Sequence, residues 1–113
     1  MVLTDQQFQT LYPVVMGWIT QTLAASSPAA QPISSKKFSR LPLYFRQEVL
    51  ASAKIVVVDA LPIPPLSKIG LTQFSDFERG YFDAITYLDT FFVRRHRSND
   101  EGLHFHELVH VVQ

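Results

Sequence analysis

The sequence predicts an α+β fold, a small twisted β-sheet with flanking helices, and three features predict it. Apolar residues recur at helical spacing near the N-terminus, a β-branched run lies mid-chain, and a capped amphipathic segment follows near the C-terminus. The 113 residues, 47% of them apolar, suit one domain with a modest core. We therefore expect a single domain over residues 1–113.

Residues 1–24 are predicted to form an amphipathic helix. Thr4 and Gln7 have the form of a capping box. Large apolar side chains then recur at helical spacing, namely Phe8, Leu11, Val15, Trp18, Ile19 and Leu23. Pro13 lies inside this pattern, where it removes a backbone donor and crowds the preceding turn. It predicts either a kink or a helix that begins near Tyr12.

A linker and a short second helix are expected next. Residues 25–38 hold few large apolar groups and are interrupted by prolines, which is typical of a surface linker. Pro42 suits the first turn of a helix, and an apolar stripe at four-residue spacing follows it, formed by Phe45, Val49 and Ala53. Residues 39–113 then make up the rest of the domain.

Two strands are predicted in this part. Ile55–Val58 is a continuous β-branched run, which favours a central strand covered on both faces. Prolines then predict a long ordered loop over residues 60–80, with a helical turn around Phe74–Arg79. Ala84–Val93 is rich in residues that fit a pleated surface and is predicted to be the second strand. The basic run Arg94–Arg97 ends it, either as a contact for an acidic partner or, as we favour, as a solvated turn.

The last segment is predicted to be a helix that presents two histidines together. Ser98 and Glu101 form a second capping box. On a helical wheel one apolar stripe would face the core, consisting of Phe105, Leu108, Val109 and Val112. His106 and His110 fall on another side, one turn apart.

The spacing of these histidines predicts a zinc site. Two imidazoles four residues apart on a helix can bind one Zn²⁺ at about 2.0–2.1 Å. Glu107 lies beside them, where its carboxylate can act as a general base without being a ligand. An ordinary amphipathic helix whose polar face happens to have this composition is the alternative.

The other two histidines are not expected to join the pair. On a straight helix His104 lies about 120° or more from His110, so we interpret it as a surface residue or one behind the ligands. His96 follows the second strand in a basic turn and is expected to be solvated.

Composition excludes several classes of function. Without cysteine, any metal must be held by imidazole and oxygen. Ten basic residues balance ten acidic ones, so neither nucleic acid nor a membrane is implied as a partner. The N-terminus does not have the pattern of a secretory signal and no run is long enough to span a membrane, so a cytoplasmic protein is expected.

The segment Leu103–Gln113 resembles the motif helix of a group of bacterial zinc metallopeptidases with the signature H-E-L-x-H-V-V-Q. The similarity extends over residues 45–113, because the strand segments upstream of the motif also resemble that group. This resemblance implies the N-terminal subdomain of a zincin, zinc held by His106 and His110, and Glu107 as catalytic base. It further implies peptide or protein substrates and a third ligand, a glutamate on a later helix, as in gluzincins.

The sequence departs from the group because it ends at Gln113, before that later helix. We therefore expect a truncated chain that is a poor catalyst alone. The alternative is a non-catalytic interaction or scaffold domain derived from a metallopeptidase. Loss of the second subdomain of a zincin is expected to expose Leu103 and Val111, and so to favour a homodimer through the motif helix.

Overall fold

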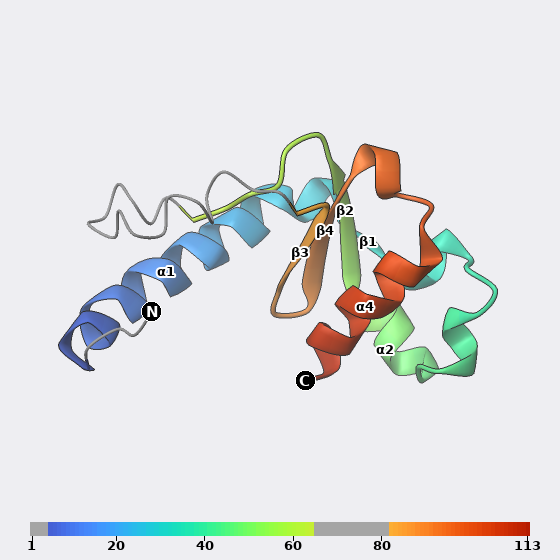
Figure 1. Cartoon of the computed structure of the whole chain (residues 1–113), viewed down its shortest axis with the longest axis horizontal. Helices are drawn as coiled ribbons and strands as arrows, with labels where there is room; N and C mark the ends of the chain where they lie inside the picture. The colour runs from blue at the N-terminus through green and yellow to red at the C-terminus, as the bar shows by residue number, and fades with distance from the viewer. Residues whose placement is uncertain (1–4, 65–81) are drawn as a thin grey trace.

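The computed structural model describes residues 5–64 and 82–113 and has the predicted α+β architecture (Figure 1). Its α-helices are α1 (Asp5–Ser26), α2 (Gln47–Ser52) and α4 (Glu101–Val112). Its strands are β1 (Gln31–Pro32), β2 (Lys54–Val58), β3 (Ala84–Tyr87) and β4 (Thr90–Arg94). No helix in these two ranges is long and apolar enough to cross a membrane.

The strands form one mixed sheet in the order β1-β2-β4-β3. β2 runs parallel to β4, with Ile55 opposite Phe91, while the two outer pairs are antiparallel. Ile55 and Val56 point to opposite faces of the sheet, and both are buried. The prediction that this run is a central strand covered on both faces is confirmed.

Each face of the sheet carries its own apolar cluster, because successive side chains of a strand alternate between faces. The C-terminal part of α1 covers one face, where Trp18 contacts Tyr87 edge to face with ring centroids 5.6 Å apart. α2 and α4 cover the other, where Leu50 and Leu108 pack with Phe91. α4 therefore lies across the sheet on the side opposite α1 (Figure 1).

The predicted single strand over Ala84–Val93 is wrong, since two strands and a tight turn occupy this segment. β3 and β4 pair antiparallel with Tyr87 opposite Thr90, which leaves Leu88 and Asp89 as the turn. Leu88 adopts a left-handed backbone with φ of 56°. Such turns favour Gly or Asn, and because Leu88 is neither, the sequence did not indicate the turn.

The predicted linker is also wrong, because residues 25–38 belong to the fold. α1 extends to Ser26, β1 pairs with β2, and the 3₁₀ turn Ile33–Lys36 follows. Ile33 is only 1% exposed and donates its backbone N–H to Ala53 O at 2.9 Å. A single buried isoleucine anchors a segment whose average composition is polar.

Three other predictions have mixed outcomes. α1 begins at Asp5 and runs through Pro13, so the later start near Tyr12 is wrong. The short second helix divides into a 3₁₀ turn over Leu41–Leu43 and α2, which ends one residue before Ala53. Thr4 of the first capping box and residues 65–81, which include the turn predicted around Phe74–Arg79, lie outside the described residues.

Candidate metal centre

The N-terminus of α4 is fixed by Asp100, and the predicted capping role of Ser98 is wrong. Asp100 Oδ1 accepts the backbone N–H of Leu103 at 3.0 Å, and its other oxygen accepts from the Arg97 guanidinium. The Leu103 amide, followed by Arg97, lowers the pKa of Asp100. Glu101 turns away from the cap and accepts the backbone N–H groups of Arg40 and Leu41 instead. These contacts set both the start and the rotation of the helix.

That rotation differs from the predicted one. The buried side chains of α4 are His104, Glu107 and Leu108. Leu103 and Val111, expected to be exposed, pack against the core. The predicted core stripe is correct only at Leu108, because Phe105 and Val112 are exposed and Val109 is half-buried. Leu103 and Val111 are both half-buried, so the expected exposure is reduced, and the homodimer stays a prediction.

His104 is a core residue, so the prediction that it lies at the surface is wrong. Its side chain is fully buried between the rings of Phe38 and Phe91. Nδ1 lies 2.7 Å from the backbone oxygen of Asp100, which requires Nδ1 to carry the proton and donate it. Nε2 is buried and has no hydrogen-bond partner among the described residues. Burial lowers the pKa of this imidazole, so neutral His104 supports the helix without joining the site.

His106 and His110 are brought together as predicted. Their Nε2 atoms lie 3.2 Å apart on one side of α4. Two nitrogens bound tetrahedrally at zinc distances of about 2.0–2.1 Å would be separated by about 3.3 Å. The observed spacing fits that geometry, and both imidazoles are exposed.

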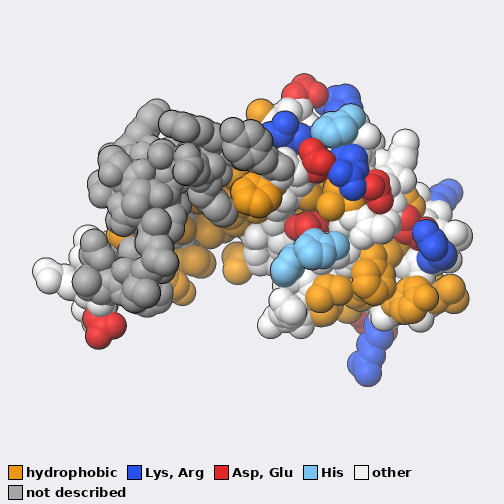
Figure 2. Space-filling model, in the orientation of Figure 1, with side chains coloured by type: hydrophobic (Ala, Val, Ile, Leu, Met, Phe, Trp, Pro, Cys, Tyr) orange, Lys and Arg blue, Asp and Glu red, His pale blue; other side chains and the backbone are white. Residues whose placement is uncertain are grey.

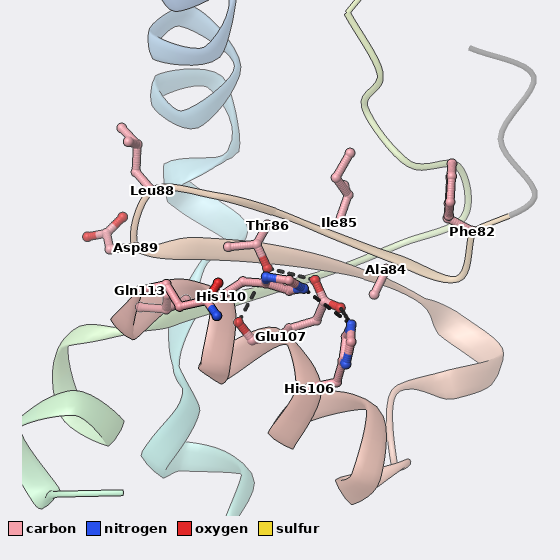
Figure 3. A pocket seen from close by; sticks show the side chains of 11 residues that line it. Phe82, Ala84, Ile85, Thr86, Leu88, Asp89, His106, Glu107, His110 and Gln113 are labelled. Atoms are coloured by element: carbon pink, nitrogen blue, oxygen red, sulfur yellow. Dashed lines mark hydrogen bonds and ion pairs between the residues drawn. The ribbon is translucent and has the colours of Figure 1, made fainter. Parts of the chain in front are cut away.

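Glu107 lies beside the pair, and its carboxylate is held by a residue that the sequence analysis missed. Glu107 Oε2 is 3.9 Å from His106 Nε2, while Oε1 accepts a hydrogen bond from Thr86 Oγ1 at 2.6 Å (Figure 3). Ligand atoms of His106, Glu107 and His110 all lie within 4.8 Å of one another. The threonine in the otherwise apolar strand Ala84–Tyr87 was the one sequence signal for this contact. Its partner could not be named from sequence, because it depends on tertiary packing.

These groups line a hollow of about 730 Å³ between β3 and α4. In Figure 3 the strand forms one wall and the histidines rise from the helix opposite. Phe82, Ile85 and Leu88 supply apolar lining, and Gln113 and Asp89 lie at its side. In Figure 2 a pale-blue histidine area near the centre of the described surface lies beside a red carboxylate and an orange hydrophobic area. The arrangement combines a place for a cation with apolar surface for a ligand.

The basic run forms intramolecular ion pairs. It lies in the end of β4 and a 3₁₀ turn over Arg95–Arg97. Arg95 contacts Asp59 at 2.9 Å, while Arg97 and His96 contact Asp83 at 2.7 and 3.4 Å. Arg95 and His96 are exposed, which supports the favoured interpretation of a solvated turn, and His96 lies outside the metal-capable group of the described residues.

Comparison with known proteins adds no assignment: no family, curated protein or solved structure matches this chain. The function must therefore be argued from the site itself.

Proposed function

We propose that His106 and His110 bind Zn²⁺ and that the site serves zinc-dependent hydrolysis of peptide bonds. The observation that carries the proposal is the convergence of two Nε2 atoms 3.2 Å apart with a carboxylate 3.9 Å away. Neutral imidazole is a preferred zinc ligand, and a separation of 3.2 Å suits two positions of a tetrahedron. The absence of cysteine leaves imidazole and carboxylate as the donors.

Each residue has a distinct part in this proposal. When bound, zinc would polarise the scissile carbonyl and acidify a water. Glu107 is the general base, because its Oε2 faces the histidine pair while Oε1 is engaged by Thr86. It would take a proton from the attacking water and pass it to the leaving amine.

The strand β3 supports a peptide as the substrate. β3 pairs with β4 on one side, and within residues 5–64 and 82–113 no strand pairs with its other edge. An extended peptide can bind such an edge through its backbone, which brings a peptide bond alongside the metal site. The exposed apolar side chains that line the hollow, Phe82 and Leu88, would contact the substrate's side chains.

Metal binding is the first test. His106→Ala and His110→Ala should each weaken Zn²⁺ binding about a hundredfold or more, because one imidazole cannot hold the ion at two positions. Isothermal titration calorimetry measures this loss. His96→Ala is the matched control, since His96 is exposed but lies outside the group, and it should bind like wild type. Equal affinity in all four proteins would refute the metal site.

A non-catalytic interaction or scaffold domain is the competing function. Among the described residues the metal-capable group offers two imidazoles and one carboxylate that Thr86 already engages, whereas catalytic zinc takes three protein ligands and a water. We therefore expect weak peptidase activity from this chain. Assays on an unstructured protein substrate, with and without a chelator, separate the two functions. Zinc binding without chelator-sensitive cleavage favours the scaffold. Chelator-sensitive cleavage that Glu107→Gln abolishes favours the enzyme.

A further inference from the structure

The contact between Thr86 and Glu107 is the feature of the site that zinc binding alone does not explain. The Glu107 side chain is buried, at 7% exposure, although it lies between two exposed histidines in the sequence. A buried carboxylate requires hydrogen-bond donors. Thr86 Oγ1 supplies one at 2.6 Å to Oε1, and it also lies 3.5 Å from the Glu107 backbone oxygen.

The position of Glu107 gives it two incompatible uses. One of its carboxylate oxygens lies within 4.8 Å of a ring nitrogen of each histidine, which can complete a three-ligand group, and carboxylate oxygen is an accepted zinc ligand. A carboxylate bound to the metal, however, is a much weaker base. The side chain can serve as ligand or as base, and something must select between the two.

We propose that Thr86 is a positioning residue that holds Glu107 out of the metal's coordination sphere and so reserves it as the base. The inference rests on the proposed metal site. By holding Oε1 toward the sheet, Thr86 limits rotation of the carboxylate toward the ion. Its hydroxyl satisfies Oε1 and leaves Oε2 toward the histidine pair, where it can accept a proton.

The sheet makes this contact rigid. Thr86 lies opposite Phe91 in the antiparallel β3–β4 pair, so its backbone is fixed by the ladder. Alternation directs Thr86 toward α4, while Tyr87, one residue later, packs with Trp18 under the other face. Ser at position 86 would retain the donor, whereas Val would retain the shape and remove it.

The test is a titration with Co²⁺, whose visible absorption reports the ligands around the ion. Thr86→Val should bind Co²⁺ about tenfold more tightly, because the released carboxylate can join the two imidazoles as a third ligand, with a changed spectrum. Thr86→Ser should match wild type in both. In the double variant Thr86→Val with Glu107→Gln, the gain should disappear, because the new ligand is gone.

Glu107→Gln in the wild-type background tests the inference without disturbing the strand, and should leave Co²⁺ affinity within about twofold of wild type because Glu107 is not a ligand there. A tenfold loss would overturn the inference even if Thr86→Val failed to fold. Wild-type affinity and spectrum in folded Thr86→Val would also overturn it, while leaving the metal site intact. Failure of wild type to bind Co²⁺ would instead refute the proposed function, and the inference with it.

Discussion

Two faces of α4 carry histidines two residues apart, and they differ in almost every physical respect. His104 is fully buried between aromatic rings, and burial lowers its pKa. His106 is 68% exposed and faces His110 across 3.2 Å. The Asp100 carbonyl fixes the His104 imidazole in one tautomer. The His106 imidazole is exposed to solvent and, among the described residues, has only the His110 ring nitrogen beside its Nε2 at hydrogen-bonding distance. Environment rather than residue type decides which of these imidazoles is open to a ligand.

The comparison also explains how a short helix holds a site. The core face anchors α4 through Leu108 and His104, and Glu101 ties its first turn to the 3₁₀ turn at Leu41. The opposite face is then free to present His106 and His110 without contributing to the core. Separate faces should respond differently to substitution.

The largest effect is expected on the core face. Leu108→Ala should lower the free energy of unfolding by about 2–5 kcal/mol, because Leu108 is fully buried and its loss leaves a cavity. Val112→Ala is the matched control on the same helix: Val112 is 53% exposed, and the change should stay within about 0.5 kcal/mol. Urea unfolding followed by circular dichroism measures both. Similar losses for the two variants would mean that α4 is rotated differently.

Substitutions at the N-terminal cap of α4 should have a smaller effect on stability, and they test where the helix begins. Asp100→Ala should cost about 1 kcal/mol of stability because the Leu103 N–H loses its acceptor. Ser98→Ala, which removes the cap predicted from sequence, should cost less than about 0.5 kcal/mol. The same unfolding experiment ranks the two. A larger loss for Ser98 would return the start of the helix to the sequence-based position.

The smallest effect concerns the pH dependence of His104. In the unfolded chain this histidine gains a proton near pH 6.5, whereas burial keeps it neutral to lower pH in the folded protein. Stability should therefore fall as pH drops below about 6.5, because the unfolded state then binds more protons. His104→Asn, which keeps a donor near Asp100, should lose less stability than wild type between pH 7.5 and 5.5. Parallel losses in the two proteins would contradict a buried neutral His104.

Several elements could be predicted because their signals are local. The β-branched run of β2, the apolar periodicity of α1 and the i, i+4 spacing of His106 and His110 each depend on a few neighbouring residues. The turn at Leu88 could not be predicted, since Leu has no preference for the left-handed backbone it adopts. Burial of Ile33 could not be predicted either, because it depends on pairing with the distant strand β2.

The sequence by itself determined that two imidazoles and a carboxylate lie near one another on a helix. The reason is that a helix has about 3.6 residues per turn, which brings positions 106, 107 and 110 close together. Only the tertiary structure decided how that helix is rotated. The hydrogen bonds of Asp100 and Glu101 and the packing of His104 against Phe38 and Phe91 turn Leu103 and Val111 inward. The same rotation brings Glu107 under Thr86, a contact across 21 positions of sequence. A helical wheel gives the angular order of side chains around one helix. Which side chains each face of that helix contacts depends on segments elsewhere in the chain.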